Sequence, residues 1–225
     1  MADAPRLITL TIDGKRVTVP QGTTIWEAAR RAGIEIPVLC HDPRLRPVGV
    51  CRMCVVDVGE RVLAASCLRP CAPDQNVVTH SPQVEGHRRM LTQLLLSDYP
   101  DESVRDRATG EDELVNLARG YRIRETPFPG GTHKPAARSK DTSSPVIAVD
   151  HRACILCDRC IRACDELQNN DVIGRTSRGY GARIAFDLNV PMGESTCVSC
   201  GECMAVCPTG ALTNKAWTGL RTGKH

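Results

Sequence analysis

Alternating apolar and polar positions open the chain and predict a β-hairpin. From Leu7 to Val19, β-branched and polar residues alternate around Asp13-Gly14, a dipeptide that favours the tight turn of a two-residue hairpin. A second hairpin is predicted further on, where Met53–Val58 and Arg61–Ala65 flank Gly59-Glu60. The N-terminal part of the chain therefore reads as a small sheet.

Helical spacing follows the first hairpin. Thr23 or Thr24 provides an N-cap and Gly33 a stop, and apolar residues recur between them at Ile25, Ala28, Ala29 and Ala32. A small mixed sheet with one helix laid across it is the β-grasp arrangement, which accommodates this order of elements.

A second helix is predicted to begin at Ser81 as N-cap, with Pro82 in its first turn, and to end near Ser97. Its apolar side is expected to consist of Val84, Met90, Leu91, Leu94 and Leu95. From Asp98 to Ser144 the chain is polar and rich in Pro and Gly, which indicates a partly irregular connector over the surface. It holds one short helical segment around residues 112–119 and a linker-like run over 126–144.

The C-terminal part shows a weak internal repeat, in which a short strand precedes a cysteine group and a short helix. The two strands are Val146–Val149 and Arg183–Phe186. Each half is too small to bury a core of its own, so the pair is expected to close around shared metal centres. The sequence thus predicts an α+β protein with three parts: a β-grasp domain over 1–80, a helix and connector over 81–144, and a cysteine-rich domain of two similar halves over 145–225.

Composition supports a metal-stabilised chain. Aromatic residues make up only 3% of the 225 residues, whereas there are 13 cysteines. The first residues carry no leader pattern and no run of about 18 apolar residues occurs, so we expect a cytoplasmic protein without a membrane span. Clustered cysteines in that reducing compartment bind metal more often than they form disulfides. A net charge of +3 with few aromatic side chains argues against nucleic acid as a partner.

Two copies of the bacterial ferredoxin cysteine run lie in the C-terminal part. In such a run three closely spaced thiolates hold one 4Fe-4S cluster and the fourth reaches the other cluster. The spacing therefore predicts one cluster on Cys154, Cys157, Cys160 and Cys207, and a second on Cys164, Cys197, Cys200 and Cys203.

The N-terminal cysteines have the spacing of a 2Fe-2S site, with ligands Cys40, Cys51, Cys54 and Cys67. The first gap is longer than in plant-type ferredoxins. Cys71 is left over, either as a buried spare thiol or as an alternative to Cys67. Zinc sites are the alternative for all three groups.

Other candidate residues near the cysteines have ordinary interpretations. His41 and His151 are expected to be loop residues rather than ligands. Arginines adjoin the sites and could offset cluster charge, although solvated side chains are the default expectation; they are Arg44, Arg46, Arg52, Arg152, Arg159 and Arg162. Nucleotide-binding glycine motifs are missing from the sequence, so we expect the chain itself to bind neither nicotinamide nor flavin and to hold no substrate site or catalytic residue.

Three stretches together resemble one family: residues 24–45, residues 49–56 and residues 197–212. They are similar to the iron-sulfur region of the complex I large peripheral subunit, the small diaphorase subunit of NAD-reducing hydrogenases and the N-terminal part of NAD-dependent formate dehydrogenases. One departure is clear, because Asp98 stands where that family begins a site of one histidine and three cysteines, and no cysteine follows it before Cys154. The third 4Fe-4S cluster of the family should be absent.

The resemblance implies an electron-transfer subunit of an NAD(P)-linked oxidoreductase of the hydrogenase or formate dehydrogenase type. Its expected partners are a flavin-containing NAD(P)H-binding subunit and a separate catalytic subunit with nickel-iron or with molybdenum or tungsten. A free-standing multi-cluster ferredoxin and an iron-sulfur subunit of the succinate dehydrogenase type remain alternatives, as does a zinc-stabilised scaffold.

Overall fold

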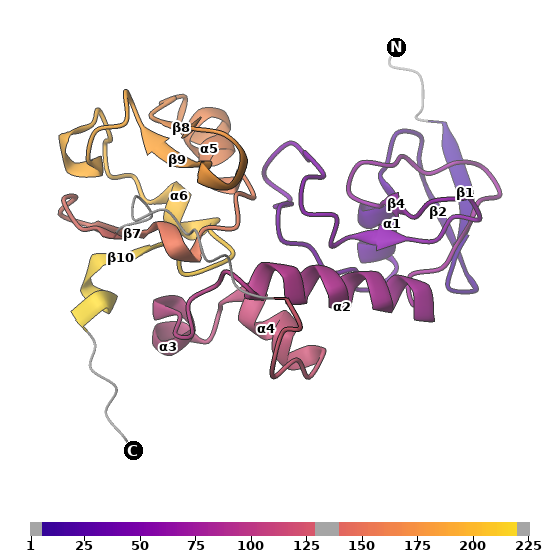
Figure 1. The fold of residues 1–225 in the computed structure, drawn as a ribbon. Coiled ribbons are helices and arrows are strands. Elements are labelled where there is room, and N and C mark those ends of the chain that lie inside the picture. Colours follow the sequence, from indigo (N-terminus) through magenta and orange to yellow (C-terminus); the bar gives the residue numbers. More distant parts are fainter. Residues whose placement is uncertain (1–5, 129–139, 220–225) are drawn as a thin grey trace, which may run out of the picture. The chain divides into compact units, whose positions relative to one another are not determined.

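The computed structural model describes residues 6–128 and 140–219, and the chain divides into two compact units. The first unit comprises the residues up to His41 together with Pro47–Leu91, and the second comprises Asp42–Arg46 and the residues from Thr92 onward. The loop between the first two cysteines thus supplies five residues, 42–46, to the second unit. Both units mix short strands and helices (Figure 1), which confirms the α+β prediction.

A three-stranded mixed sheet forms the base of the first unit. β1 (Leu7–Ile12) pairs antiparallel with β2 (Lys15–Pro20) and parallel with β5 (Asn76–Val77). Asp13 and Gly14 both adopt positive φ, at 48° and 79°, as the tight hairpin turn requires. The predicted first hairpin is therefore confirmed, and β5 adds the parallel strand that makes the sheet mixed.

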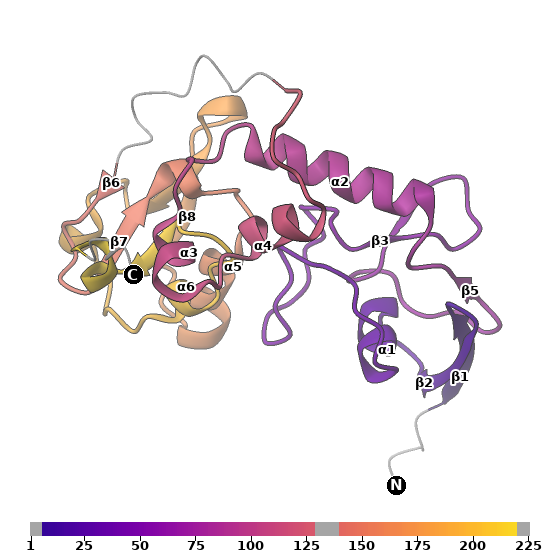
Figure 2. The same ribbon diagram turned by 90° about the horizontal axis from the view of Figure 1, so that it is seen from below.

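Helix α1 (Ile25–Arg31) begins at a capping box. The Thr24 hydroxyl accepts the Glu27 backbone N–H, while the Glu27 carboxylate accepts the Thr24 N–H, each at 3.2 Å. The helix lies beside the sheet in Figure 2 and shares one hydrophobic core with it. That core includes Leu10, Ile12, Val19, Ile25, Ala28, Ala29, Val77, Cys54, Cys67 and Cys71.

The second predicted hairpin is confirmed but shorter than expected. Only β3 (Val55–Val56) and β4 (Ala64–Ala65) pair, antiparallel and with Val55 opposite Ala65. Both strands are fully buried. The intervening residues form turns rather than longer strands, which leaves the flanking cysteines in loops.

Helix α2 (Pro82–Leu96) has the predicted start and end. The Ser81 hydroxyl accepts the Val84 N–H at 3.2 Å, as an N-cap does. The predicted apolar side is only partly right, because Val84 is buried and Leu91 and Leu95 are half-buried. Buried positions follow Val84, Arg88 and Thr92, whereas Met90 and Leu94 are exposed. A regular stripe four residues apart is buried, but its members are partly polar, and apolarity alone could not identify it.

The connector is more ordered than the sequence indicated. Besides α4 (Glu113–Gly120), close to the expected helix, it contains α3 (Val104–Thr109). It also carries buried polar groups, among them Ser103 and Asp112, so its description as a surface segment is wrong. Part of the predicted linker, residues 129–139, lies outside the described residues.

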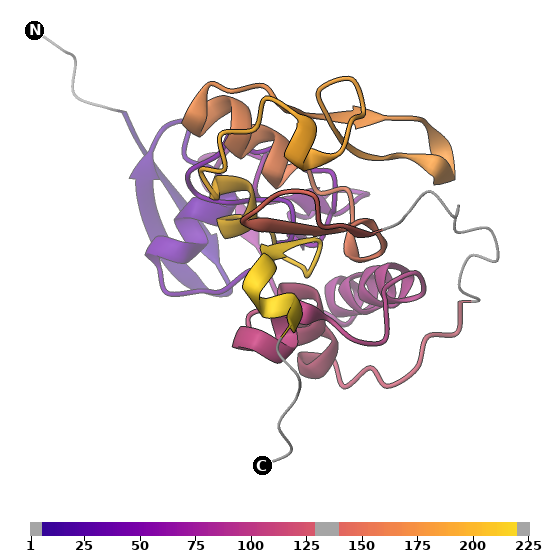
Figure 3. The same ribbon diagram turned by 90° about the vertical axis from the view of Figure 1, so that its left-hand side faces the viewer.

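The strands of the second unit are short and come from distant parts of the sequence. β7 (Ile147–Asp150) pairs antiparallel with β10 (Leu212–Asn214) and with β6 (Lys140–Asp141), while β8 (Ile173–Thr176) pairs antiparallel with β9 (Arg183–Phe186). The strands β7 and β9 confirm the two that the internal repeat predicted. Figure 3 turns this unit toward the viewer.

Short helices follow the two cysteine loops of the second unit. α5 (Arg159–Arg162) runs directly into a π-helical turn, η2 (Ala163–Leu167), and α6 (Glu202–Ala205) occupies the equivalent place in the second half. The remaining turns are 3₁₀-helical: η1 (His151–Ala153), η3 (Gly179–Gly181), η4 (Met192–Glu194) and η5 (Lys215–Gly219). Among the described residues, every helix is too short or too polar to cross a bilayer.

Candidate metal centres

Four cysteines of the first unit come together as two close pairs. The sulfur atoms of Cys54 and Cys67 lie 3.3 Å apart, and the Cys40 backbone N–H donates to Cys51 Sγ at 3.4 Å. The pKa of Cys67 is raised by its hydrogen bond to Cys54, by burial and by the charges of Cys54, Cys40 and Cys51. All four predicted 2Fe-2S ligands are therefore electrostatic neighbours.

The backbone around these cysteines is held in tight loops. Arg52 adopts φ 58°, and the N–H of the next residue, Met53, donates to Cys51 Sγ at 3.5 Å. Gly49, with φ 64°, passes so close to the Leu68 side chain that a Cβ would collide with it. The loop conformation thus directs backbone N–H groups at sulfur, as a bound anionic cluster would require.

Cys71 lies in the hydrophobic core rather than with the paired thiols. Its backbone N–H donates to the Thr23 carbonyl at 2.9 Å. Burial, together with the charge of Glu27, raises the pKa of its thiol to about 11. Of the two alternatives left open by the spacing, Cys67 is the one whose sulfur meets Cys54, and Cys71 packs as a buried thiol.

The first ferredoxin run surrounds a cavity in the second unit. Cys154 and Cys157 precede α5, Cys160 lies on it, and Cys207 arrives from the other half of the internal repeat; all four line the same cavity. Its other walls are mainly apolar, formed by Ile155, Leu156, Asp158, Ile184, Thr209, Ala211 and Leu212. Water is largely excluded from such a lining.

The second run forms an equivalent group. Burial raises the pKa of Cys203 to about 12, with further increases from Cys197, Cys200, Cys207 and Cys164. The pKa of Cys164 is raised by burial and by Cys200 and Cys197. Cys164, which follows α5 in the first half, is therefore an electrostatic neighbour of Cys197, Cys200 and Cys203, whereas Cys207 lines the cavity of the first run.

A shared backbone signature marks the two loops. Leu156 and Asp158, on either side of Cys157, have φ 54° and 61°; Ser199 and Gly201, on either side of Cys200, have φ 55° and 85°. Left-handed conformations are costly for residues other than glycine and cluster at binding sites. Alternating right- and left-handed residues turn successive N–H groups toward one point and form a nest for an anion.

The chemistry of the donor set fits iron-sulfur clusters. Burial raises the pKa of the Cys157 and Cys160 thiols, because a thiolate without a countercharge is unfavourable in an apolar cavity. Bound iron supplies that countercharge, since metal ligation requires thiolates. Within residues 6–128 and 140–219, no three His, Cys, Asp or Glu side chains gather closely enough for a single metal ion. The cysteines of the first ferredoxin run instead line a cavity.

The arginines beside the cysteines fall into two classes. The side chains of Arg44, Arg46 and Arg152 are 49%, 83% and 46% exposed, which agrees with the expectation that these arginines are solvated. That expectation is wrong for Arg159 and Arg162, which are buried. One sequence signal pointed to their burial: Arg159 and Arg162 lie three residues apart, which is also the spacing of Cys154, Cys157 and Cys160.

The histidines have different surroundings. His41, next to Cys40, is buried and meets the Trp26 ring edge-on, with centroids 4.5 Å apart. It is thus an interior residue rather than the polar loop residue expected. His151 is half-buried and opens the 3₁₀ turn before Cys154.

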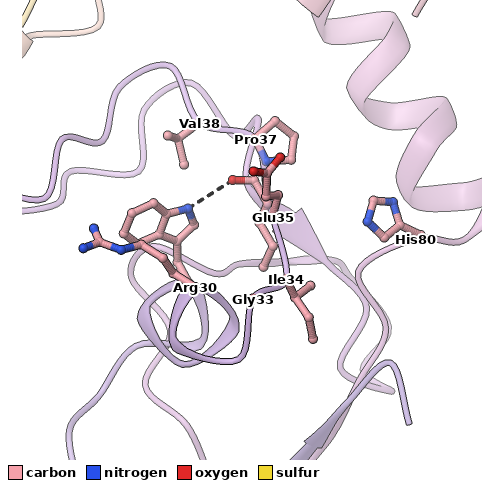
Figure 4. Close-up of a pocket in the computed structure, with 9 residues that line it drawn as sticks. Arg30, Gly33, Ile34, Glu35, Pro37, Val38 and His80 are labelled. Atoms are coloured by element: carbon pink, nitrogen blue, oxygen red, sulfur yellow. Dashed lines mark hydrogen bonds between the residues drawn. The ribbon is translucent and has the colours of Figure 1, made fainter. Parts of the chain in front are cut away.

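An open cavity of about 760 Å³ lies in the first unit beside Trp26. The Trp26 indole N–H donates to the Ile36 carbonyl at 3.1 Å, and the Arg30 guanidinium lies 5.6 Å from the ring centroid. Figure 4 shows Arg30 and His80 on opposite sides of this opening, with Pro37, Val38 and Glu35 along its rim. Its lining is mainly apolar, with no cluster of convergent polar groups among the described residues.

Comparison with known proteins supports the same division of the chain. Residues 5–82 match the family model of the 2Fe-2S iron-sulfur cluster binding domain. Residues 144–213 match the ferredoxin-like domain of NADH-quinone oxidoreductase subunit 3. The two matches enclose the three cysteine groups described above.

Individual relatives combine both regions. The chain is 40% identical over 213 residues to the NADP-reducing hydrogenase subunit HndD of Solidesulfovibrio fructosivorans, covering 92% of this chain and 36% of that protein. It is 36% identical over 210 residues to an NADH-quinone oxidoreductase subunit of Rhizobium meliloti (strain 1021), covering 92% and 24%. The chain therefore spans about a third or less of the length of these curated relatives.

A solved structure gives a match of nearly full length. This chain is similar to a chain in the crystal structure of an NAD⁺-reducing NiFe hydrogenase in the H2-reduced state, with a TM-score of 0.85 and 29% identity. The match covers 96% of this chain and 90% of that chain. The resemblance drawn from the sequence motifs is confirmed. Residues 5–82 thus match the 2Fe-2S iron-sulfur cluster binding domain family and residues 144–213 match the ferredoxin-like domain of NADH-quinone oxidoreductase subunit 3, and nearly the whole chain is similar to parts of subunits of NAD(P)-linked hydrogenase and NADH-quinone oxidoreductase.

Proposed function

We propose that this chain relays single electrons within an NAD(P)-linked oxidoreductase complex, of the hydrogenase type first and the formate dehydrogenase type second. In this proposal the chain holds one 2Fe-2S and two 4Fe-4S clusters and has no substrate site of its own. The observation that carries the proposal is the exchange of fourth cysteines, in which Cys207 lines the cavity of the first run and Cys164 faces the second.

The proposed ligands follow the three groups. They are Cys40, Cys51, Cys54 and Cys67 for the 2Fe-2S cluster; Cys154, Cys157, Cys160 and Cys207 for one 4Fe-4S cluster; and Cys164, Cys197, Cys200 and Cys203 for the other. When bound, each cluster accepts and releases one electron at a time. The proposed domains are 1–80, 81–144 and 145–225.

The protein's own part in this function is to hold the sulfur ligands and shape their surroundings. Backbone N–H groups donate to ligand sulfurs, as Ser199 does to Cys197 at 3.4 Å. The apolar walls of the cavity around Cys207 exclude water. Hydrogen bonds to sulfur and solvent exclusion are two of the factors by which proteins set the reduction potential of such clusters.

The proposed partners are a flavin-containing NAD(P)H-binding subunit and a separate catalytic subunit, which carries nickel-iron or molybdenum or tungsten. The relatives support this proposal, because their names place them in NADP-reducing hydrogenase and NADH-quinone oxidoreductase. The proposed location is the cytoplasm, where thiols remain reduced.

Iron and sulfide analysis of the full chain, purified without oxygen, tests the cofactor proposal. One 2Fe-2S and two 4Fe-4S clusters require about ten iron atoms per chain. Dithionite reduction should give electron paramagnetic resonance signals from both cluster types. Zinc in place of the expected iron, or a spectrum without signals, would contradict the cofactor proposal.

Two matched variants test the exchanged ligands. Cys207→Ala should deplete the cluster at Cys154, Cys157 and Cys160, and Cys164→Ala should deplete the other, each losing at most four irons. Loss of the same cluster in both variants would reject the exchange. Co-purification of the tagged chain from anaerobic extract, with metal and flavin analysis of the companions, tests the partners.

A further inference from the structure

Two arginines of the first ferredoxin run, Arg159 and Arg162, are buried, and Arg159 is the less exposed of them. Arg159 lies between Cys157 and Cys160 in the sequence and is 4% exposed. Isolated charges are very unfavourable in such surroundings, so a buried arginine needs a compensating partner. Because Arg159 lies within a proposed ligand loop, both the ion-pair partner and the bound cluster are candidates to compensate its charge.

Arg159 is fixed by a fork-like ion pair. Its two terminal nitrogens donate to the two carboxylate oxygens of Glu113, at 2.6 and 2.9 Å. Nη1 also reaches the Val206 carbonyl at 3.3 Å. Two-point pairing of this kind holds a guanidinium in a single orientation. Arg159 is therefore a fixed charge rather than a mobile one.

The Nε–H of Arg159 has a different status. It is buried and has no hydrogen-bond partner among the described residues. The Val206 carbonyl, to which Nη1 donates, directly precedes Cys207, so the guanidinium lies against the backbone that carries the fourth ligand of this site. Glu113 thus pairs with the two terminal nitrogens and leaves the Nε–H without a partner among the described residues.

Glu113 is itself anchored by the connector. It begins α4, and its backbone N–H donates to the Pro208 carbonyl at 2.8 Å, directly after Cys207. The preceding residue, Asp112, accepts hydrogen bonds from the Tyr99 and Ser103 hydroxyls, each at 2.5 Å. The backbone of Glu113 is therefore held in place beside a buried network, while its carboxylate, 40% exposed, is fixed by the pairing with Arg159 itself.

A second arginine in the same loop region provides a natural comparison. Arg152 lies two residues before Cys154, as Arg159 lies two residues after Cys157, but it is half-exposed and pairs with Asp150 at 2.8 Å. Water screens a charge in that position strongly, whereas a buried charge is screened little. Burial, not distance along the sequence, separates the two residues.

We propose that Arg159 raises the reduction potential of the 4Fe-4S cluster held by Cys154, Cys157, Cys160 and Cys207, and that Glu113 limits this effect. Reduction adds one electron to the cluster, with no bond made or broken. A fixed positive charge stabilises the more negative, reduced form. The Glu113 carboxylate opposes it. This inference rests on the proposed cluster assignment.

Redox titration of the full iron-loaded chain, followed by electron paramagnetic resonance, tests the proposal. Arg159→Gln should lower the reduction potential of one 4Fe-4S cluster by about 59 mV. For one electron this corresponds to about a tenfold decrease in the equilibrium constant for reduction. Glu113→Gln should raise the potential of that same cluster by a smaller amount, because the Glu113 carboxylate is 40% exposed and water screens part of its charge. Arg159→Lys should lie between Arg159→Gln and the wild type.

Arg152→Gln is the matched control and should change the constant by less than about twofold. Glu113→Gln provides an independent test if Arg159→Gln assembles poorly. Potentials of iron-loaded Arg159→Gln and Glu113→Gln that stay unchanged, or shift in the same direction, would overturn the proposal. Wild-type protein without 4Fe-4S signals would instead contradict the proposed function itself.

Discussion

The two units reach order by different means. In the first, six-residue strands β1 and β2 and helix α1 enclose a hydrophobic core in which Leu10, Ile12 and Ile25 are fully buried. In the second, strands have two to four residues and the helices of the cysteine loops, α5 and α6, have four each. Helices and hairpins of that length are not stable alone.

Both units bury polar side chains, such as Thr79 and Arg88 in the first, but most of the buried charged side chains lie in the second. The second unit buries several charged or hydroxyl side chains close to the cysteine loops: Ser103, Arg105, Asp112, Arg159, Arg162 and Thr209. The Arg105 guanidinium donates to the Met204 carbonyl at 2.7 Å, and the Thr209 hydroxyl to the Ala153 carbonyl at 2.8 Å. We infer that hydrogen bonds and metal ligation organise this unit, whereas apolar burial organises the first.

The largest expected effect follows from removing iron, which should open parts of the second unit but not of the first. Anaerobic chelation should abolish amide protection in β8 and β9, because their short pairing depends on the closed cysteine loops. Protection in β1 and α1 should largely persist, because their core is mainly apolar and only Cys54 and Cys67 among its buried residues are proposed ligands. Hydrogen exchange followed by mass spectrometry, with untreated anaerobic protein as control, measures both. Equal loss in the two units would remove the contrast.

The sequence predicted the first unit better for the same reason. The turn at Asp13-Gly14, the cap at Thr24 and the stripe through Ile25 and Ala28 are local signals, and each element they indicate is present. The connector lacked such signals. Its ordered state depends on Asp112 meeting Tyr99 and Ser103, residues whose pairing is set by tertiary packing.

The candidate sites show a similar division. Cysteine spacing predicted the three groups, because ligand reach is local within a run. The exposure of the arginines could not be predicted in this way. Arg159 and Arg152 both adjoin cysteines, but only Arg159 has a carboxylate, Glu113, brought to it from 46 residues away.

A smaller but substantial effect is expected for the connector network. Asp112→Ala leaves two buried hydroxyls without their acceptor and removes the N-cap bond to Val115, which should cost about 3 kcal/mol of local stability. Native-state hydrogen exchange in α3 and α4 measures it. The control is Glu102→Ala, whose ion pair with Arg107 is exposed and worth under about 1 kcal/mol. A similar small cost for both variants would contradict the proposed role of the network.

In the first unit, one buried arginine departs from the apolar pattern. Arg88 is fully buried, and its guanidinium donates to the Val55 carbonyl at 2.8 Å. Arg88→Met keeps most of the side-chain volume but leaves that carbonyl without its donor, so about 2 kcal/mol should be lost. Exchange rates at β3 and α2 report it, with the exposed Arg89→Met as control. A neutral Arg88→Met would show that burial alone holds α2.

The smallest effect tests whether α1 depends on its own sequence. Thr24→Ala removes the side-chain acceptor of the capping box and should destabilise the helix by about 1 kcal/mol. Thr24→Ser keeps a hydroxyl and should restore most of it. Helices α5 and α6 begin instead at left-handed residues without a side-chain cap, so their start is set by the cysteine loops. Faster exchange confined to α1, with the iron content unchanged, is the expected result; iron loss from the mutation would show that the first unit, too, is organised by its cluster.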